Sequence, residues 1–276
     1  MSKPRHTDLT DHRARKRFGQ NFLVDDNVIN KIVDAIHPRE DDNLIEIGPG
    51  QGAMTRPLLD RCPLLQVVEL DRDLAALLTD KFRNYPEFKL HQGDALKTDF
   101  RQFRFGEKPM RIVGNLPYNI STPLIFHLLS YVGEVIDMHF MLQKEVVDRL
   151  AASPGEKAYG RLTVMAQYYC QVEPLFLVPP GSFHPAPKVD SAIVRLLPYK
   201  DLPFPAEDVS LLQRLVSACF QQRRKTLRNS LKNFVGADQL DQLDIDLQLR
   251  PEVLSVADFV RLSNQIHAMT RDSKND

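Results

Sequence analysis

Short apolar runs alternate with helical patterns between about residues 28 and 199 of the chain. Five runs have the length and composition of buried strands, at 43–47, 65–70, 88–91, 111–113 and 136–142. Between them, apolar residues recur at helical spacing at 55–61, 74–82, 123–129 and 144–152. Alternating strands and helices with short links predict an α/β fold, in which helices cover both faces of a mostly parallel sheet.

The last two strand-like runs, 172–178 and 192–197, have no helical pattern between them. They are therefore expected to form an antiparallel hairpin at one edge of the sheet. A proline-rich stretch follows at 198–206, and beyond it the apolar spacing is helical at 209–220, 226–234 and 256–269. These patterns divide the chain into a basic flexible arm at 1–17, an α/β domain at 18–200 and a small all-helical domain at 205–270.

Composition narrows the class of protein. The 276 residues are 43% hydrophobic and 26% charged, which are ordinary globular values. No apolar run reaches the roughly 20 residues of a membrane helix, and the N-terminus has no apolar signal core. Cys62, Cys170 and Cys219 are scattered and odd in number, which favours the reducing cytoplasm. No Cys/His spacing resembles a zinc site, so no metal is expected.

Basic residues are concentrated in two segments although the net charge is zero. Residues 3–17 hold six Lys/Arg, and residues 221–232 (QQRRKTLRNSLK) hold five Lys/Arg and no acid. Such segments in a neutral chain indicate a phosphate-binding face. The alternative is a solvated helix face with no binding role.

A glycine-rich loop, EIGPGQG at 46–52, lies between a predicted strand and a predicted helix. In a doubly wound sheet this position binds nucleotide-like ligands, because glycines let the backbone approach closely. The spacing Gly48-x-Gly50-x-Gly52 differs from G-x-G-x-x-G, and no Lys-Ser/Thr follows, which disfavours a pyrophosphate or an ATP phosphate. Alone, the loop is also compatible with a simple tight turn.

Two acids at the next strand ends strengthen the interpretation. Glu69 ends the second strand about 20 residues after the loop, where a carboxylate can accept ribose hydroxyls, and Asp94 ends the third, within reach of an adenine amino group. The order of loop, ribose acid and adenine-side acid resembles the S-adenosylmethionine site of Rossmann-like class I methyltransferases. The resemblance implies that Gly48, Gly50, Glu69 and Asp94 bind this cofactor.

The fourth strand ends in GNLPYNIST at 114–122. Asn-Leu-Pro-Tyr resembles the [N/D]-x-P-[Y/F/W] signature of methyltransferases that act on exocyclic amines of bases. The Asn115 side-chain oxygen and the Leu116 carbonyl can accept hydrogen bonds from adenine N6, Pro117 holds the backbone, and Tyr118 can stack on the base. The alternative is a Pro-containing turn with a half-buried tyrosine. Ser121 and Thr122 are expected to cap the next helix.

A second aromatic for stacking occurs in FHPAPKVDS at 183–191, in the loop between the last two strands. Phe183 is placed to stack opposite Tyr118, and Lys188 to meet a phosphate. A stiff proline-rich turn without either role is the alternative.

Taken in order, these motifs and GQNFL (19–23) resemble those of the ribosomal RNA adenine dimethyltransferases. The resemblance implies N6,N6-dimethylation of two adjacent adenosines near the 3′ end of small-subunit rRNA, late in subunit assembly. It also implies that Asn21 and Leu23 close over the cofactor, that Asn115 lines it, and that the helical domain binds rRNA. We expect a cytoplasmic monomer that does not associate with membranes, with these residues on the rRNA: Lys188, Arg223, Arg224, Lys225 and Arg228.

Three alternatives remain open from the sequence. The antibiotic-resistance enzymes that act on large-subunit rRNA share the motifs but commonly have Ile at the second quartet position and lack the Gly of GQNFL, so Leu116 and Gly19 favour the small subunit. An assembly factor that mainly binds immature subunits is compatible with the same residues. A nicotinamide dehydrogenase would have the fold, but the glycine spacing is wrong for it.

Overall fold

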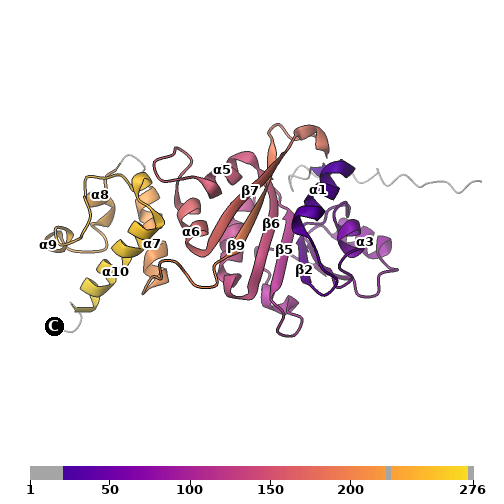
Figure 1. The fold of residues 1–276 in the computed structure, drawn as a ribbon, viewed down its shortest axis with the longest axis horizontal. Helices are drawn as coiled ribbons and strands as arrows, with labels where there is room; N and C mark the ends of the chain where they lie inside the picture. The colour runs from indigo at the N-terminus through magenta and orange to yellow at the C-terminus, as the bar shows by residue number, and fades with distance from the viewer. Residues whose placement is uncertain (1–20, 222–224, 273–276) are drawn as a thin grey trace, which may run out of the picture.

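The computed structural model describes residues 21–221 and 225–272. A seven-stranded sheet occupies the middle of an elongated molecule, and the C-terminal helices form one end of it (Figure 1). The predicted arm at 1–17 lies outside the described residues. Within the described residues, no helix has the length and apolar content needed to cross a membrane.

The sheet has the strand order β4-β3-β2-β5-β6-β9-β7. Strands β2 to β6 pair in parallel, whereas β9 runs antiparallel to both β6 and β7. The predicted antiparallel hairpin at one edge is therefore confirmed. The bounds are β2 Asn43–Ile47, β3 Gln66–Glu69, β4 Lys89–Gln92, β5 Met110–Asn115, β6 Val135–Gln143, β7 Cys170–Val178 and β9 Ser191–Pro198.

Helices cover both faces of the sheet, as the alternating pattern predicts. Side chains of α1 (Asp26–Ile36), α2 (Thr55–Leu59) and α3 (Arg72–Lys81) share one apolar cluster with Val67 and Val113 of the strands. The opposite face packs against a second group of helices. These are α4 (Ser121–Leu128), η4 (Leu129–Glu134), α5 (Lys144–Ala151) and α6 (Arg161–Tyr169), with η3 (Phe100–Phe103) beside them.

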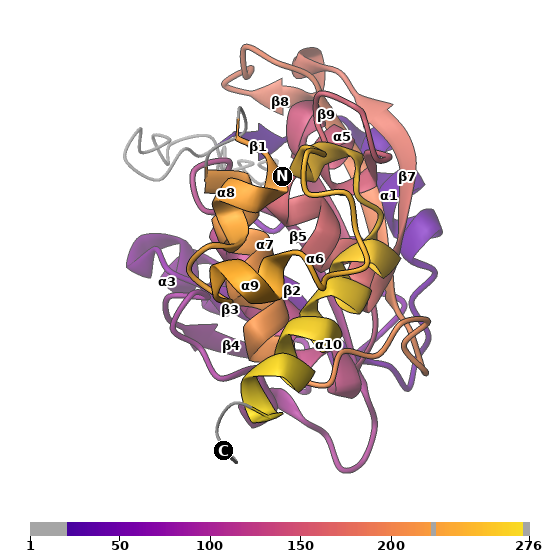
Figure 2. The same cartoon turned by 90° about the vertical axis from the view of Figure 1, so that its left-hand side faces the viewer.

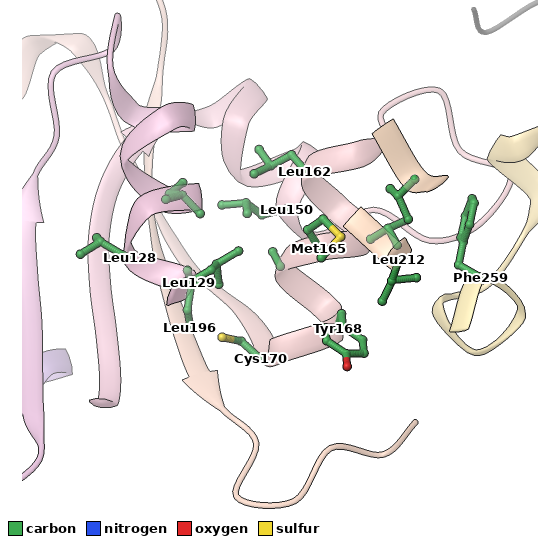
Figure 3. Close-up of a cluster of buried hydrophobic side chains, with 14 of the residues drawn as sticks. Leu128, Leu129, Leu150, Leu162, Met165, Tyr168, Cys170, Leu196, Leu212 and Phe259 are labelled. Carbon is green, nitrogen blue, oxygen red and sulfur yellow. The ribbon is translucent and has the colours of Figure 1, made fainter. Parts of the chain in front are cut away.

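The C-terminal helices pack on α6 and share its core. Leu162 and Met165 of α6 lie in one buried cluster with Leu212 and Phe259 (Figure 3). The turned view places these helices in front of the sheet (Figure 2). The division into domains at about 200–205 stays a prediction, and a continuous apolar core joins the two parts. The elements are α7 Val209–Gln221, α8 Leu227–Leu231, α9 Ala237–Leu240, η6 Pro251–Val253 and α10 Val256–Asp272.

A two-stranded ribbon connects the first described residues to the loop before β9. Strand β1 (Phe22–Leu23) pairs antiparallel with β8 (Phe183–His184), directly after η5 (Pro180–Ser182). The Val24 amide extends the ribbon by donating to the Ser182 carbonyl at 2.9 Å. The ribbon thus ties together the start and the end of the α/β part of the chain.

Candidate functional site

The carboxyl ends of β2, β3, β4 and β5 surround one cavity, because parallel strands all end at the same edge of the sheet. The cavity contains about 1150 Å³ of empty space, a figure that includes the part open to solvent. The structure therefore brings most of the predicted site residues together. Those that line it are Asn21, Leu23, Gly48, Gly50, Glu69, Asp94, Asn115, Leu116, Pro117 and Tyr118.

The glycine loop at the end of β2 is tied to the acid at the end of β3. Gly50 has φ +60°, and an added Cβ would lie 3.2 Å from the Phe22 ring. Its amide donates to Glu69 Oε2 at 3.2 Å, and the Asp71 amide donates to Glu69 Oε1 at 2.8 Å. Burial raises the pKa of Glu69 above its ordinary value. Both carboxylate oxygens keep further lone pairs for ligand hydroxyls.

Glu46 is a cavity residue to which the sequence analysis gave no role. It is buried in β2 and lines the cavity, and the Thr55 hydroxyl donates to its Oε2 at 2.6 Å. Burial, with a further contribution from the nearby Glu69 carboxylate, raises the pKa of Glu46 to about 7. Its position as the first residue of EIGPGQG is the sequence signal that could have identified it.

Asp94 lies where the sequence places it, directly after β4. Its Oδ1 accepts a hydrogen bond from the Leu96 amide at 3.0 Å, which orients the carboxylate at the end of the strand. The residue is half-buried and lines the cavity on the side of Gly93 and Ala95. A hydrogen-bond acceptor is therefore fixed near the end of β4, in the same cavity as Glu69.

The charge of the cavity indicates which ligand fits. Four carboxylate residues, Glu46, Glu69, Asp71 and Asp94, contribute to its lining, and among the described lining residues there is no Lys, Arg or His. A pyrophosphate would face these acids without a cation, which argues against a nicotinamide dinucleotide. A sulfonium cofactor carries positive charge and no phosphate, so the residues present fit S-adenosylmethionine.

The Asn-Leu-Pro-Tyr turn begins at the end of β5. Gly114 is required there, because an added Cβ would lie 2.4 Å from the Ile47 carbonyl oxygen of β2. Asn115 Nδ2 donates to the Asn21 carbonyl at 3.2 Å, which leaves Asn115 Oδ1 as an acceptor on the cavity side. The Leu116 amide donates to the Met141 carbonyl at 3.2 Å. Within residues 21–221 and 225–272, nothing donates to the Leu116 carbonyl oxygen.

Tyr118 is half-buried at the rim of the cavity, and its hydroxyl lies 2.7 Å from Ser191 Oγ of β9. Burial raises the pKa of the Tyr118 phenol, so the ring is neutral at physiological pH. The prediction that Ser121 and Thr122 cap the next helix is wrong. Helix α4 begins at Ser121 itself, and the Ser121 hydroxyl donates to the Tyr118 carbonyl at 3.2 Å, since the chain already turns at Pro117.

Phe183 and Lys188 lie outside the cavity lining. The Phe183 side chain is 4% exposed and packs in the apolar cluster of α1, while its backbone pairs with Leu23. Stacking of a base on Phe183 stays a prediction, and it requires that the ring be uncovered. Lys188 is exposed on the loop between β8 and β9.

The residues predicted to contact rRNA have different surroundings. Lys225 is exposed just before α8, whereas Arg228 within α8 forms an ion pair with Asp241. Arg223 and Arg224 lie outside the described residues. Lys225 thus presents its charge to solvent, and Arg228 must leave or share its carboxylate to meet a phosphate.

Comparison with known proteins identifies the family. The sequence profile described as "Ribosomal RNA adenine dimethylase" matches residues 11–268. The chain belongs to the ribosomal RNA adenine dimethylase family. It is therefore a methyltransferase that modifies adenine in ribosomal RNA, and S-adenosylmethionine is its methyl donor.

Relatives and solved structures agree with the family. A ribosomal RNA small subunit methyltransferase A from Marinobacter nauticus is 62% identical over 253 residues, covering 92% of this chain and 91% of its own. One of the same name from Pseudomonas aeruginosa is 58% identical, covering 94% and 97%. The crystal structure of a dimethyladenosine transferase from Plasmodium falciparum matches with TM-score 0.75 and 27% identity, covering 92% and 98%. The 23S rRNA methyltransferase ErmE matches with TM-score 0.68 and 26% identity, covering 90% and 100%.

Proposed function

We propose that this protein transfers methyl groups from S-adenosylmethionine to N6 of two adjacent adenosines near the 3′ end of small-subunit (16S) rRNA, giving dimethyladenosine. The observation that carries the proposal is a pair of acceptors, Asn115 Oδ1 and the Leu116 carbonyl, at the end of β5 in the cavity that also holds Glu69 and Asp94. The choice of the small subunit is supported by the relatives named for it at 57–62% identity.

The acceptors suit an aromatic amine. The N6 lone pair of adenine is delocalised into the ring, which makes the amine a weak nucleophile. Hydrogen bonds from N6 to Asn115 Oδ1 and to the Leu116 carbonyl favour a pyramidal nitrogen with its lone pair directed away from the ring. Pro117 fixes the backbone, and the Tyr118 face stabilises the base and the positive charge that develops on it. When bound, S-adenosylmethionine supplies an electrophilic methyl group.

No strong base is needed, because an alkylated adenine ammonium loses its proton readily. Positioning and electrostatics therefore provide most of the rate enhancement. On the cofactor side, Glu69 would accept the ribose hydroxyls and Asp94 the adenine amine. Gly48 and Gly50 would pass beneath the methionine and ribose, and the ribbon residues 21–23 would close the site. These cofactor contacts are assigned from the order in which the ends of β2, β3 and β4 occur along the chain.

The substrate side extends beyond the cavity. We infer that the helical part at 205–270 contacts rRNA phosphates, and that the basic residues on the rRNA include Lys188, Arg223, Arg224, Lys225 and Arg228. The protein would act as a cytoplasmic monomer on the small ribosomal subunit or its precursor, late in assembly. Because several positive side chains of the enzyme would contact phosphates of the rRNA, binding to the particle should weaken strongly as the salt concentration rises.

The decisive experiment compares methyl transfer to the small and to the large ribosomal subunit. Small and large subunits lacking the modification are incubated with labelled S-adenosylmethionine, and the rRNA is digested and analysed by mass spectrometry. We expect two dimethyladenosines per small subunit and none in the large subunit. Transfer to the large subunit alone would favour the alternative activity, for which the likeness to ErmE is the specific observation. No transfer to either particle by folded protein would overturn the proposal.

An assembly role is tested with Glu69→Gln. This change removes the charge but keeps the size of the side chain that Gly50 and Asp71 hold. Loss of transfer with unchanged binding to immature subunits would separate binding from chemistry. Loss of both would show that particle binding depends on the cofactor site.

A further inference from the structure

The Tyr118–Ser191 hydrogen bond crosses the carboxyl edge of the sheet. Tyr118 follows β5 and Ser191 opens β9, and β6 lies between these strands. Neighbouring strands are about 4.8 Å apart, so the side chains join positions separated by roughly 10 Å over the end of β6. The phenol ring therefore extends away from the cofactor-side strands β2, β3 and β4 and is held at its far end.

Ser191 is a rigid anchor. It is fully buried, and its backbone pairs with Gln143 of β6 on one side and with Val178 of β7 on the other. The preceding residue is also fixed, since the Lys144 amide donates to the Asp190 carbonyl at 2.9 Å. The Ser191 backbone cannot move far without breaking the sheet, so the hydroxyl can shift only by changing its rotamer.

The hydroxyl of Ser191 has one side-chain partner among the described residues, and that partner is the Tyr118 hydroxyl. A buried hydroxyl without a partner is unfavourable, so the two groups satisfy each other. Apart from the bond of the Asn115 side chain to Asn21, the other hydrogen bonds of the turn act on its backbone, through the Leu116 amide and the Pro117 and Tyr118 carbonyls. Among the described residues, Ser191 is thus the group that fixes the outer end of the ring.

We propose that Ser191 is a positioning residue that holds the Tyr118 ring as a fixed platform for the target adenine. The inference rests on the proposed function, because it assumes that Tyr118 stacks on the base. A ring free to turn about its two side-chain torsions would present its face at a variable angle to Asn115 Oδ1 and the Leu116 carbonyl. The hydrogen bond removes that freedom before the base arrives.

The effect should differ between the two methyl transfers. In the first transfer N6 carries two hydrogens, so both acceptors can orient the amine. In the second only one hydrogen remains, so Asn115 and Leu116 cannot both keep their bonds. Stacking on Tyr118 then carries more of the orientation, and the anchor at Ser191 matters more.

The test compares wild type with Ser191→Ala, Tyr118→Phe and the double variant. Single-turnover reactions on unmethylated small subunits are quenched at intervals, and monomethyl- and dimethyladenosine are counted by mass spectrometry. We expect each single variant to slow the second transfer about fivefold, the factor expected for one ordinary hydrogen bond, and the first transfer less. The double variant should be no slower than Tyr118→Phe, because both changes remove the same bond.

The control is Ser263→Ala, which removes another buried serine hydroxyl, in α10 and far from the turn. It should leave the ratio of the two products unchanged, and cofactor affinity measured by calorimetry should be the same in all variants. The inference fails if Ser191→Ala matches wild type, if both transfers slow equally, or if the double variant is slower by the product of the single effects. Absence of transfer by wild type would instead overturn the proposed function and the inference with it.

Discussion

Asn115 Nδ2 donates a hydrogen bond to the main-chain carbonyl of Asn21, 94 positions earlier in the chain. This bond fixes which end of the Asn115 amide faces the cavity, and it ties the Asn115 side chain to the ribbon over the glycine loop. The first described residues of the chain therefore help to define the Asn-Leu-Pro-Tyr turn. Closure of the ribbon and orientation of Asn115 are linked through one contact.

Asn115→Asp should break the link between closure of the ribbon and orientation of the residue 115 side chain. A carboxylate cannot donate to the Asn21 carbonyl and would place negative charge about 3 Å from it. We expect methyl transfer to fall by about 10- to 100-fold, since one charged acceptor replaces an oriented amide in the site. Hydrogen exchange of the Val24 amide, which closes the ribbon onto Ser182, should become faster.

The matched control is Asn119→Asp, which adds the same charge to an exposed residue of the same turn. Its effect on transfer should be smaller, and exchange at Val24 should not change. Equal effects of the two variants would show that added charge, not the lost bond to Asn21, decides the outcome.

Gly50→Ala tests how tightly the ribbon covers the loop. Gly50 and Gly106 have nearly the same positive φ, +60° and +63°, so alanine meets a similar φ penalty at both positions. An alanine Cβ at Gly50 would also meet the Phe22 ring at 3.2 Å, whereas at Gly106 nothing lies within 4 Å. We expect cofactor affinity to fall at least about tenfold in Gly50→Ala only, which calorimetry can measure. A similar fall in Gly106→Ala would exclude steric pressure on Phe22 as the cause.

Much of the site could be predicted because it depends on one regularity. Parallel strands present their carboxyl ends at the same edge, so Gly48, Glu69, Asp94 and Asn115 converge without any knowledge of long-range contacts. The strand β2 was predicted with the bounds that the structure gives it, since all five of its residues are buried and the apolar residues Leu44, Ile45 and Ile47 are concentrated within it.

The parts that could not be predicted depend on contacts between distant segments. Helix α6 is buried nearly all around, so it has no amphipathic stripe to reveal it. The β1–β8 ribbon has two residues in each strand, too few for any alternation. The caps assigned to Ser121 and Thr122 were wrong because Pro117 turns the chain first, and the burial of Phe183 depends on packing against α1.

Glu46 should make stability depend on pH. Its pKa is raised from 4.5 to about 7, so the folded state binds its proton more tightly than the unfolded state. The stabilisation is fully present below about pH 4.5 and is lost as pH rises to about 7. Over that window the free energy of unfolding should fall by an amount on the order of 3 kcal/mol. Glu46→Gln, which can still accept from Thr55, should remove this contribution to the slope.

Denaturant unfolding at several pH values measures the effect, with Glu87→Gln as a control that removes an exposed carboxylate. Wild type and the Glu87 variant should lose stability across the window, and the Glu46 variant should lose clearly less, because only the contribution of Glu69, whose pKa is also raised, remains. A slope in Glu46→Gln as steep as that of wild type would assign the pH dependence to Glu69 and other groups.

Phe183→Leu addresses the aromatic that the structure places outside the cavity. The change keeps most of the apolar volume in the cluster with Leu23, so it should cost about 1 kcal/mol of stability or less. If the ring is uncovered when RNA binds and stacks on the base, the second methyl transfer should slow more than the first, for the reason that applies to Tyr118. Mass spectrometry of monomethyl- and dimethyladenosine over time gives both rates.

Phe176→Leu is the control, because Phe176 packs against the same cluster and does not line the cavity. Equal slowing of both transfers by Phe183→Leu would contradict the stacking role, and unchanged rates would show that Phe183 stays buried and supports Leu23 alone.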